Sequence, residues 1–324
     1  MLNEWLKGNG FRENLKEKTP RIFTPGMAQE SPHIGILNIS DGCLDACSFC
    51  STRLVKGKHR SVSPEKILSE AKRYLENGCK ELWLTGQDTS CYGFDIGTNL
   101  AELAKKILEQ NSGDYKIRLG MGNPRHLEKY LDEMLSVYED DRIYKFIHLP
   151  VQSGSDPVLQ AMGRKHNVNT FRKMAEAFIS KFSYFTLSTD IIVGFPGETR
   201  EDFEQTCKLI SDLKPSICNI TRFVARPNTV AEKLPNKIPG KEQHYRSATL
   251  SELFQKIALE NNLSRVGKTT KVLTEKSGHR NGTYIARDEA YRSIALKGNY
   301  KPGTWLNVQI EKAETFALLA KEVL

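Results

Sequence analysis

The 324 residues include 39% hydrophobic side chains, and the mean hydropathy of −0.47 is typical of a soluble globular protein. No apolar run approaches the ~20 residues of a membrane span, the N-terminus has no apolar signal core, and the odd number of seven cysteines disfavours a disulfide framework, so the sequence predicts a cytoplasmic protein without membrane contact. Most of the net charge of +8 comes from residues 265–324, which favours a polyanion partner bound through this tail over a charge that serves only solubility.

Residues 1–32 are polar and mixed in charge and are predicted to form a linker or arm. From His33 onward, apolar runs alternate with stretches of helical periodicity. The predicted strands cover residues 34–39, 81–84, 116–121, 144–149, 186–193 and 217–224, and the predicted helices cover residues 63–78, 99–108, 124–138, 168–182, 199–213 and 240–265. Six strand–helix units indicate an α/β fold with a parallel sheet and outer helices. Because a complete eight-unit barrel typically needs ~250 residues, an open, partial (β/α)6 barrel is predicted.

The periodicity changes after Arg265. Short strands are predicted over residues 271–273, 283–285, 293–296, 305–310 and 316–320, with Gly and Asn between them. Five short strands in about sixty residues predict a small all-β, antiparallel barrel of the oligonucleotide-binding type. The chain is therefore divided into an arm (1–32), an α/β core (33–265) and a C-terminal barrel (266–324).

The most informative segment is the loop that follows the first predicted strand. It contains Cys43, Cys47 and Cys50 with the spacing C-x3-C-x2-C. Thiolates this close together can converge on one metal centre, and iron–sulfur clusters prefer such ligands. A cubane cluster normally uses four thiolates, so one iron would remain open. The alternative is a structural zinc site with His59 as the fourth ligand, although zinc sites usually use two separated cysteine pairs.

Polar or glycine-rich segments also follow four of the later strands. They are Leu84-Thr85-Gly86-Gln87-Asp88-Thr89 and residues 148–156 (HLPVQSGSD), 189–199 (TDIIVGFPGET) and 222–229 (RFVARPNT). Together with the cysteine loop, this set resembles the radical S-adenosylmethionine (radical SAM) methylthiotransferases. The resemblance covers residues ~33–324, and the tail is similar to the family's RNA-binding TRAM domain, a five-strand barrel. Residues 84–97 and 120–124 are most similar to the archaeal and eukaryotic branch of the family.

That branch acts on N6-threonylcarbamoyladenosine at position 37 of tRNA and gives its 2-methylthio derivative. The resemblance therefore implies a tRNA methylthiotransferase. It also implies that Cys43, Cys47 and Cys50 hold one [4Fe-4S] cluster whose open iron binds S-adenosylmethionine, and that electron transfer then yields a 5′-deoxyadenosyl radical. The implied cofactor-binding residues are Phe49 and Gly194 at the adenine, Gly86 and Gln87 at the amino-acid end, Gln152 and Ser153 near the ribose, and Asp190 and Glu198, which could instead cap turns and helices.

Two groups of basic residues are candidates for RNA contact. Arg53, Lys56, Lys58 and Arg60 follow the cysteine loop, and Lys271, Arg287, Arg292 and Lys297 interleave in the tail with Tyr284, Tyr291, Trp305 and Phe316. Aromatic side chains can stack on unpaired bases while the cations contact phosphates. A solvated face is the alternative for the first group, and about half of the four aromatic side chains should be barrel core. The remaining cysteines, including Cys91, are expected to stay out of the site.

Family members normally carry a further domain ahead of the radical core, with three cysteines for a second cluster implicated in sulfur delivery. This sequence has no cysteine before Cys43. We therefore expect a fragment, a chain whose second-cluster domain is a separate protein, or an enzyme that has lost the sulfur step. An electron donor protein is expected as a partner. Alone, the chain is expected to bind one cluster and cleave the cofactor without adding sulfur. A radical SAM enzyme of another outcome, such as an RNA methylase, and an idle RNA-binding protein with a structural metal are the alternatives.

Overall fold

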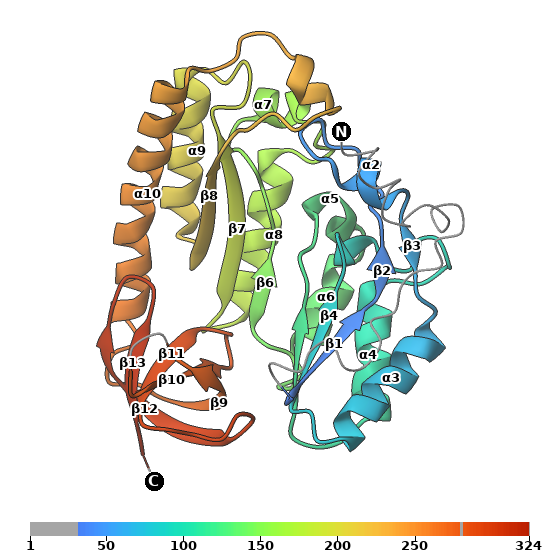
Figure 1. The fold of residues 1–324 in the computed structure, drawn as a ribbon, viewed down its shortest axis with the longest axis vertical. Coiled ribbons are helices and arrows are strands. Elements are labelled where there is room, and N and C mark those ends of the chain that lie inside the picture. The colour runs from blue at the N-terminus through green and yellow to red at the C-terminus, as the bar shows by residue number, and fades with distance from the viewer. Residues whose placement is uncertain (1–31, 279–280, 324) are drawn as a thin grey trace, which may run out of the picture.

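The computed structural model describes residues 32–278 and 281–323, so the predicted arm lies outside the described residues except for Pro32. The core is built on six parallel strands. They are β1 (Ile34–Asn38), β4 (Glu81–Thr85), β5 (Lys116–Leu119), β6 (Phe146–His148), β7 (Thr186–Val193) and β8 (Ile217–Arg222). The first three form one parallel ladder and the last three form another, each in chain order (Figure 1).

The two ladders meet where β5 passes β6. The amide of Tyr144 donates to the carbonyl of Ile117 at 3.0 Å, and the amide of Gly122 donates to the carbonyl of His148 at 2.9 Å. The strand order across the core therefore follows the chain, with β1 at one edge and β8 at the other. This arrangement confirms the predicted open barrel of six strand–helix units.

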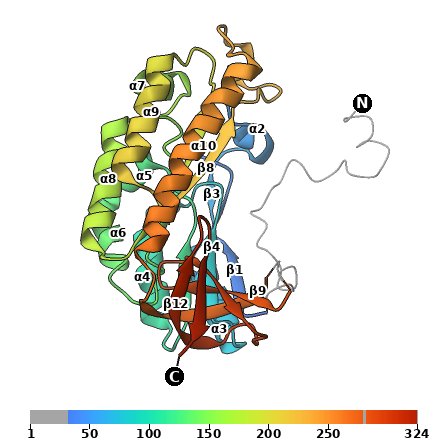
Figure 2. The same cartoon turned by 90° about the vertical axis from the view of Figure 1, so that its left-hand side faces the viewer.

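The longer helices of the core are α3 (Pro64–Glu76), α4 (Leu100–Gln110), α8 (Val168–Lys181), α9 (Arg200–Leu213) and α10 (Gly240–Leu263). Figure 2 shows α8, α9 and α10 side by side on one side of the strands. Side-chain caps fix where three of them begin, because Asn99, Asn167 and Thr199 each accept a hydrogen bond from a backbone amide of the first turn. Within the described residues, every helix is too short or too polar to cross a lipid bilayer.

The single helix predicted over residues 124–138 is wrong. The structure divides it into α5 (Pro124–Leu127), a 3-10 turn (Glu128–Tyr130) and α6 (Leu131–Val137). Tyr130 leaves the helical conformation, with φ of −143° and ψ of 37°. Its hydroxyl donates to the backbone carbonyl of Ser90 at 2.6 Å, so a tertiary contact overrides the local helical periodicity.

Several short elements beside the strand ends were not predicted. They are the paired strands β2 (Ser40–Asp41) and β3 (Arg60–Ser61), the helices α2 (Thr52–Lys56) and α7 (Asp156–Ala161), and the 3-10 turns η1 (Thr89–Cys91) and η3 (Val230–Lys233). They are too short to show a hydrophobic period, which is the signal that locates longer elements in a sequence.

The tail forms a closed five-strand barrel, as predicted. Its strands are β9 (Thr269–Ser277), β10 (Thr283–Asp288), β11 (Ser293–Lys297), β12 (Trp305–Ala313) and β13 (Leu318–Glu322), in the order β10-β11-β13-β12-β9. One pair, β11 with β13, is parallel, whereas the sequence predicted an antiparallel barrel throughout. Phe316 precedes β13 and is 67% exposed, so the last predicted strand begins two residues too early.

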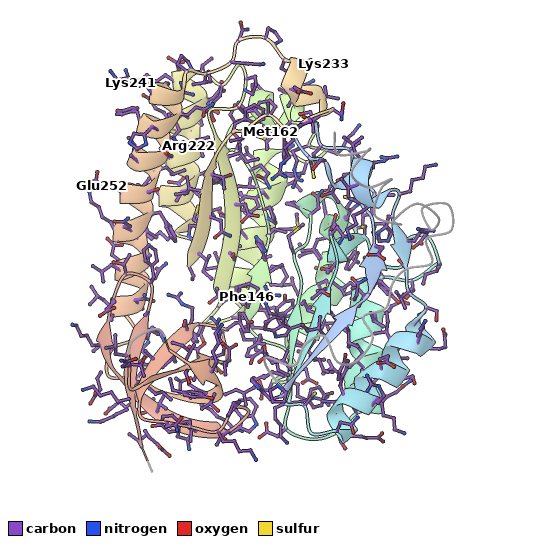
Figure 3. All side chains as sticks on the ribbon, viewed as in Figure 1. Phe146, Met162, Arg222, Lys233, Lys241 and Glu252 are labelled. Carbon is purple, nitrogen blue, oxygen red and sulfur yellow. The ribbon has the colours of Figure 1, made fainter. Side chains whose placement is uncertain are left out.

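The barrel packs against the amino ends of the core strands. Its Tyr291 lies with its ring centroid 4.8 Å from that of Tyr144 and 5.2 Å from that of Phe146. Phe146 begins β6 near the barrel, whereas Met162 lies at the opposite end of the core (Figure 3). The eight residues of β7 alone span roughly 26 Å at about 3.3 Å per residue. The carboxyl ends of the strands therefore lie far from the barrel.

Glu81 is a fully buried carboxyl group at this junction. Burial raises its pKa to about 7, although the indole of Trp83 donates a hydrogen bond to it. The unfolded chain ionises this group from about pH 4.5, so the folded state binds more protons and loses stability as the pH rises from about 4.5 to 7.

Glu81→Gln should therefore raise the free energy of unfolding by up to about 3 kcal/mol at pH 8 and have little effect at pH 5. Urea unfolding of the cluster-free chain at the two pH values measures this difference. If Glu81→Gln gained the same stability at both pH values, the raised pKa of Glu81 would be contradicted. Glu252→Gln, at an exposed position, is the control and should show no such gain.

Candidate functional site

The cysteine loop lies at the carboxyl ends of the strands and is held from three sides. Gly42 has φ of 76°, and a β-carbon there would collide with the backbone carbonyl of Lys58. Ser48 donates through its amide to the carbonyl of Met162 and through its hydroxyl to that of Ala161, both at 2.8 Å. Its carbonyl accepts from the amide of Ala231, also at 2.8 Å. Segments far apart in the sequence therefore fix the path of the loop.

The three thiols of the loop are half-buried and free. Burial raises the pKa of Cys43 to about 12, with smaller contributions from the nearby carboxylates of Asp88 and Asp45. Burial also raises the pKa of Cys47, while the guanidinium of Arg164 opposes this shift. A bound metal inverts this balance, because a coordinated thiol is deprotonated. The donor set of three thiols fits an iron–sulfur cluster better than it fits a hard cation.

His59 does not join this donor set. Its Nε2 lies 3.0 Å from the hydroxyl of Ser61 and 3.6 Å from a carboxylate oxygen of Asp95, and its Nδ1 lies 3.4 Å from Cys91 Sγ. Both ring nitrogens therefore have protein partners, which removes the support for a zinc site completed by His59. Cys91 is fully buried and is an electrostatic neighbour of Cys43, so it lies nearer to the loop than expected.

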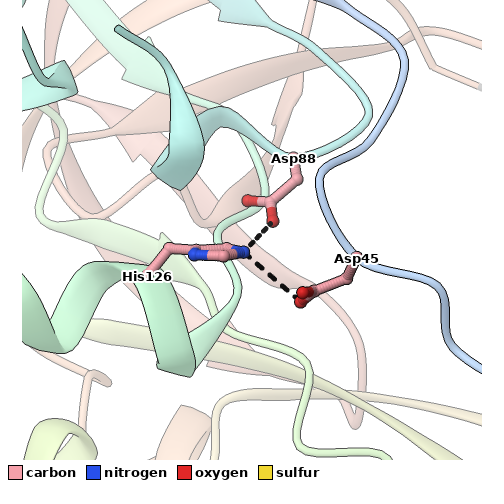
Figure 4. A group of neighbouring side chains, drawn as sticks. All are labelled: Asp45, Asp88 and His126. Carbon is pink, nitrogen blue, oxygen red and sulfur yellow. Dashed lines mark ion pairs between the residues drawn. The ribbon is translucent and has the colours of Figure 1, made fainter. Parts of the chain in front are cut away.

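A buried polar network joins the loop to the segments after β4 and β5 (Figure 4). His126 Nε2 lies 3.3 Å from Asp45 Oδ2 and 3.8 Å from Asp88 Oδ2, and all three residues are buried. Their ligand atoms are close enough to hold a metal ion. However, Arg125 pairs with Asp45 Oδ1, and the Asn123 amide donates to Asp45 Oδ2 at 2.5 Å. Both oxygens of Asp45 are thus satisfied, so the network anchors the loop.

Gly86 and Gln87 directly follow β4. A β-carbon at Gly86 would lie 2.8 Å from the hydroxyl oxygen of Ser40, so only glycine fits without a shift. The side-chain oxygen of Gln87 is buried and has no hydrogen-bond partner among the described residues. An unsatisfied buried acceptor is costly, and it fits a ligand that supplies a donor, such as the amino group of S-adenosylmethionine.

Gln152, Ser153 and Asp190 differ in how far their side chains are free to bind a ligand. Gln152 is half-buried and has φ of 79°, a strained conformation of the kind that clusters at functional sites. Asp190 accepts hydrogen bonds from Asn219 at 2.8 Å and pairs with His148 at 2.9 Å. Burial alone would raise the pKa of Asp190, but these partners hold it below its ordinary value. Ser153 is fully buried, and its hydroxyl accepts from the amide of Ser155.

Gly194 and Glu198 are tied to α10. The amide of Gly194 donates to Glu198 Oε2 at 2.6 Å, and Arg246 Nη1 donates to the same oxygen at 2.8 Å. Gly194 has φ of 74°, and a β-carbon there would collide with the side chain of Gln243. Phe49 is half-buried against an apolar cluster that includes Phe195. The Glu198 carboxylate therefore has internal partners, and Phe49 contributes to the packing of this apolar cluster.

The first group of predicted RNA-binding residues is exposed. Arg53, Lys56, Lys58 and Arg60 lie on or beside α2, and no ion pair joins any of them to another described residue.

Three of the four tail cations have internal partners. Lys271 pairs with Asp114 at 2.9 Å, Arg287 donates to Glu275 at 3.0 Å, and Arg292 donates to Asn262. The ring of Tyr291 lies under the Arg287 guanidinium. Arg287 and Arg292 thus belong to the junction between barrel and core. Lys297 is exposed.

Sequence reasoning missed two features of the site. Arg164 contacts the cysteine loop from the segment after α7, and only its place in the fold reveals this. A second exposed basic group lies near the loop, because the amide of Ala231 in η3 bonds to Ser48. It comprises Lys233 in η3 itself and the exposed Arg222, Arg226 and Lys237 on the adjoining segments; Figure 3 labels Arg222 and Lys233. The sequence spaces these four among apolar and polar residues, so no basic run was apparent.

Comparison with known proteins agrees with this geometry. Residues 37–210 match the radical SAM superfamily, and residues 263–323 match the TRAM domain. Among solved structures, coproporphyrinogen III oxidase from Escherichia coli, a radical SAM enzyme, is similar with a TM-score of 0.51 and 13% identity, covering 91% of this chain and 73% of that one. At this identity the likeness concerns the fold alone.

Curated relatives are more similar in sequence. A protein of Pyrococcus abyssi named probable threonylcarbamoyladenosine tRNA methylthiotransferase is 41% identical over 98% of this chain and 72% of its own length. A protein of Pyrococcus horikoshii with the same name is 42% identical over 88% of this chain and 66% of its own length. The human threonylcarbamoyladenosine tRNA methylthiotransferase is 35% identical over 92% of this chain and 52% of its own length. The chain thus spans between about half and about three quarters of the length of these relatives. It belongs to the radical SAM superfamily and, within it, to the family of threonylcarbamoyladenosine tRNA methylthiotransferases.

Proposed function

We propose that this chain carries the radical step in the methylthiolation of N6-threonylcarbamoyladenosine at position 37 of tRNA, at C2 of the base. The observation that supports this most strongly is the identity of 41% over 98% of the chain, which includes both the cysteine loop and the barrel. The substrate is proposed from the names of these relatives, and the three thiols at the strand ends are suited to holding the cluster that the radical step needs.

Cys43, Cys47 and Cys50 would hold a [4Fe-4S] cluster, and Gln87 would accept a hydrogen bond from the amino group of S-adenosylmethionine. When bound, these groups supply a one-electron cleavage of a carbon–sulfur bond that yields a carbon radical able to abstract hydrogen. The protein's own contribution is to fix positions. The Ser48 hydrogen bonds and the Asp45 network hold the cysteine loop, and Gln152 lies in the segment that follows β6, with a backbone φ of 79°.

The RNA would be held at two places. The cations on or beside α2 follow the cysteine loop directly, and Lys233 lies in η3, which contacts the loop through Ala231, so both face the place where the base must react. The barrel lies at the other end of the strands, roughly 26 Å away by the length of β7. An anticodon arm is long enough to span this distance, so the barrel would contact the arm away from the reacting base. Unpaired loop bases can be splayed into a protein site, which suits a modification at position 37.

Neutralising the basic group at α2 should weaken RNA binding in a salt-dependent way. The triple variant Arg53→Gln, Lys56→Gln and Arg60→Gln is expected to lower affinity for an anticodon stem-loop about 10- to 100-fold at low salt. Each lost phosphate contact should reduce the slope of log affinity against log salt by about 0.7 to 0.9. Fluorescence anisotropy over a range of KCl concentrations measures both quantities.

The matched control removes three exposed lysines from outer helices, Lys72, Lys106 and Lys173. It changes the net charge equally but leaves the basic group at α2 intact, so its affinity and salt slope should stay close to those of the unaltered chain. Equal losses in both triple variants would contradict a binding surface at α2.

Sulfur insertion requires a source of sulfur, and we propose that a second-cluster domain supplies it to this core. An electron donor protein would reduce the cluster, and the cytoplasm, where thiols stay reduced, suits both. Taken by itself, the described core would bind one cluster. Iron and sulfide assays on the anaerobically reconstituted chain test this, because a stoichiometry of two clusters per chain would overturn it.

Mass spectrometry of tRNA nucleosides from cells with and without the gene tests the function directly. The 2-methylthio derivative of N6-threonylcarbamoyladenosine should disappear when the gene is removed. A methylated product without sulfur would instead identify an RNA methylase. Unchanged nucleosides, together with zinc in the purified protein and no 5′-deoxyadenosine, would identify an RNA-binding protein with a structural metal.

A further inference from the structure

We infer that Arg164 sets the reduction potential of the cluster by hydrogen-bonding to the sulfur of Cys47. The inference rests on the proposed function, in which Cys47 is a cluster ligand. Arg164 Nη1 lies 3.5 Å from Cys47 Sγ and is its donor. In the part of the chain that the structure describes, no other arginine or lysine donates to a thiol of the loop.

The guanidinium is held in place by two further acceptors. Its Nη2 donates to the carbonyl of Pro150 at 2.9 Å and to Asn123 Oδ1 at 3.3 Å. Pro150 follows β6, and Asn123 begins α5, so Arg164 bridges two core segments before it reaches the loop. The planar fork of arginine can serve all three acceptors at once, and a lysine ammonium cannot match this geometry.

The backbone around Arg164 is fixed against the same loop. Met162 and Ala161, which precede it, accept the hydrogen bonds of Ser48. Gly163 has φ of 71°, and a β-carbon there would lie 3.4 Å from the amide nitrogen of Ser48. The turn after α7 therefore brings the chain up to the loop and directs the next side chain at Cys47.

A hydrogen bond to a ligand sulfur stabilises the oxidised and the reduced cluster to different extents. Reduction adds one electron, and part of the added negative charge resides on the ligating sulfurs. A cationic hydrogen-bond donor stabilises the more negative state, so it raises the potential. Of the other arginines near the loop, Arg125 pairs with Asp45, which offsets its charge, and Arg53 donates to the carbonyl of Leu44 and not to a thiol. Arg164 is therefore a positioning and tuning residue, distinct from the ligands themselves.

The test is an EPR-monitored potentiometric titration of the anaerobically reconstituted full chain. Arg164→Gln should make reduction at least tenfold less favourable, which for a one-electron couple corresponds to about 59 mV toward negative potential. Arg164→Lys keeps a cation but loses the fork, and its shift should have the same sign and a smaller size. The lysine variant also serves if the glutamine variant does not retain the cluster.

Two controls separate an effect of the Arg164 hydrogen bond on the potential from a loosened cysteine loop and from a general loss of positive charge. Ser48→Ala removes the side-chain hydrogen bond of the loop to Ala161 without changing any charge, and Arg172→Gln removes an arginine that pairs with Asp212 on the outer helices. Both should shift the potential less than Arg164→Gln does. A full cluster with unchanged potential in both Arg164 variants overturns this inference alone. An unaltered chain that binds no cluster overturns the assignment of the three thiols, and this inference with it.

Discussion

Cys47→Ala is expected to eliminate the absorbance of the reconstituted cluster and the formation of 5′-deoxyadenosine from S-adenosylmethionine. Substitutions of outer partners of metal ligands typically cost 10- to 100-fold, so the loss of a ligand should lower the rate of cofactor cleavage by more than about 100-fold.

Cys43→Ala and Cys50→Ala are expected to give the same losses, because each removes one of the three thiols of the loop. The buried Cys91 should not compensate for Cys43→Ala, because its thiol donates to the carbonyl of Asp88 at 3.3 Å and lies 3.4 Å from His59 Nδ1. Cys207→Ala, on the outer helix α9, is the matched control and should behave as the unaltered chain.

Iron and sulfide content, the visible absorption spectrum and chromatographic detection of 5′-deoxyadenosine measure these outcomes. If Cys47→Ala kept its brown colour and its cofactor cleavage, the three thiols could not be the ligands, and the function proposed from them would have no basis.

The elements of the fold that could be predicted are those long enough to show a periodic pattern of apolar residues in the sequence. The strands of the core and the five strands of the barrel each carry an apolar pattern within a few residues, and the cap at Thr199 marks where α9 begins. The break at Tyr130 was not predictable, because it depends on a hydroxyl that reaches the carbonyl of Ser90, forty residues away. Short elements such as α2 lack a full period and were missed for that reason.

The site was predictable where one segment contains the whole signal. The cysteine loop is such a segment, and Gln87 lies directly behind a predicted strand. Residues that converge from different segments leave no local pattern. Arg164 meets Cys47 across 117 positions of sequence, and Asp45 meets Asn123 across 78. For the same reason Arg287 was predicted to bind RNA, although it donates a hydrogen bond to Glu275 and lies over the ring of Tyr291 at the junction of barrel and core.

Arg246→Met is expected to destabilise the fold by about 3 to 5 kcal/mol, because it leaves the buried carboxylate of Glu198 without its cation. The side chains of Arg246 and Glu198 are 6% and 1% exposed, and their atoms Nη1 and Oε2 are 2.8 Å apart. Burial already raises the pKa of Glu198, and the hydrogen bond from Arg246 is the largest effect that opposes this. Without Arg246 the carboxyl would bind a proton, so the loss of stability should be larger at pH 8 than at pH 5.

The double variant Arg246→Met with Glu198→Gln removes the unpaired charge and should recover part of the lost stability, since two neutral groups are cheaper to bury than one ion. Urea unfolding of the four cluster-free chains completes a double-mutant cycle. Losses that simply add would show that the pair does not interact. Glu198→Gln alone also bears on its predicted cofactor role: if the carboxylate only positions Gly194, the cluster-loaded variant should bind S-adenosylmethionine about as tightly as the unaltered chain while its stability falls.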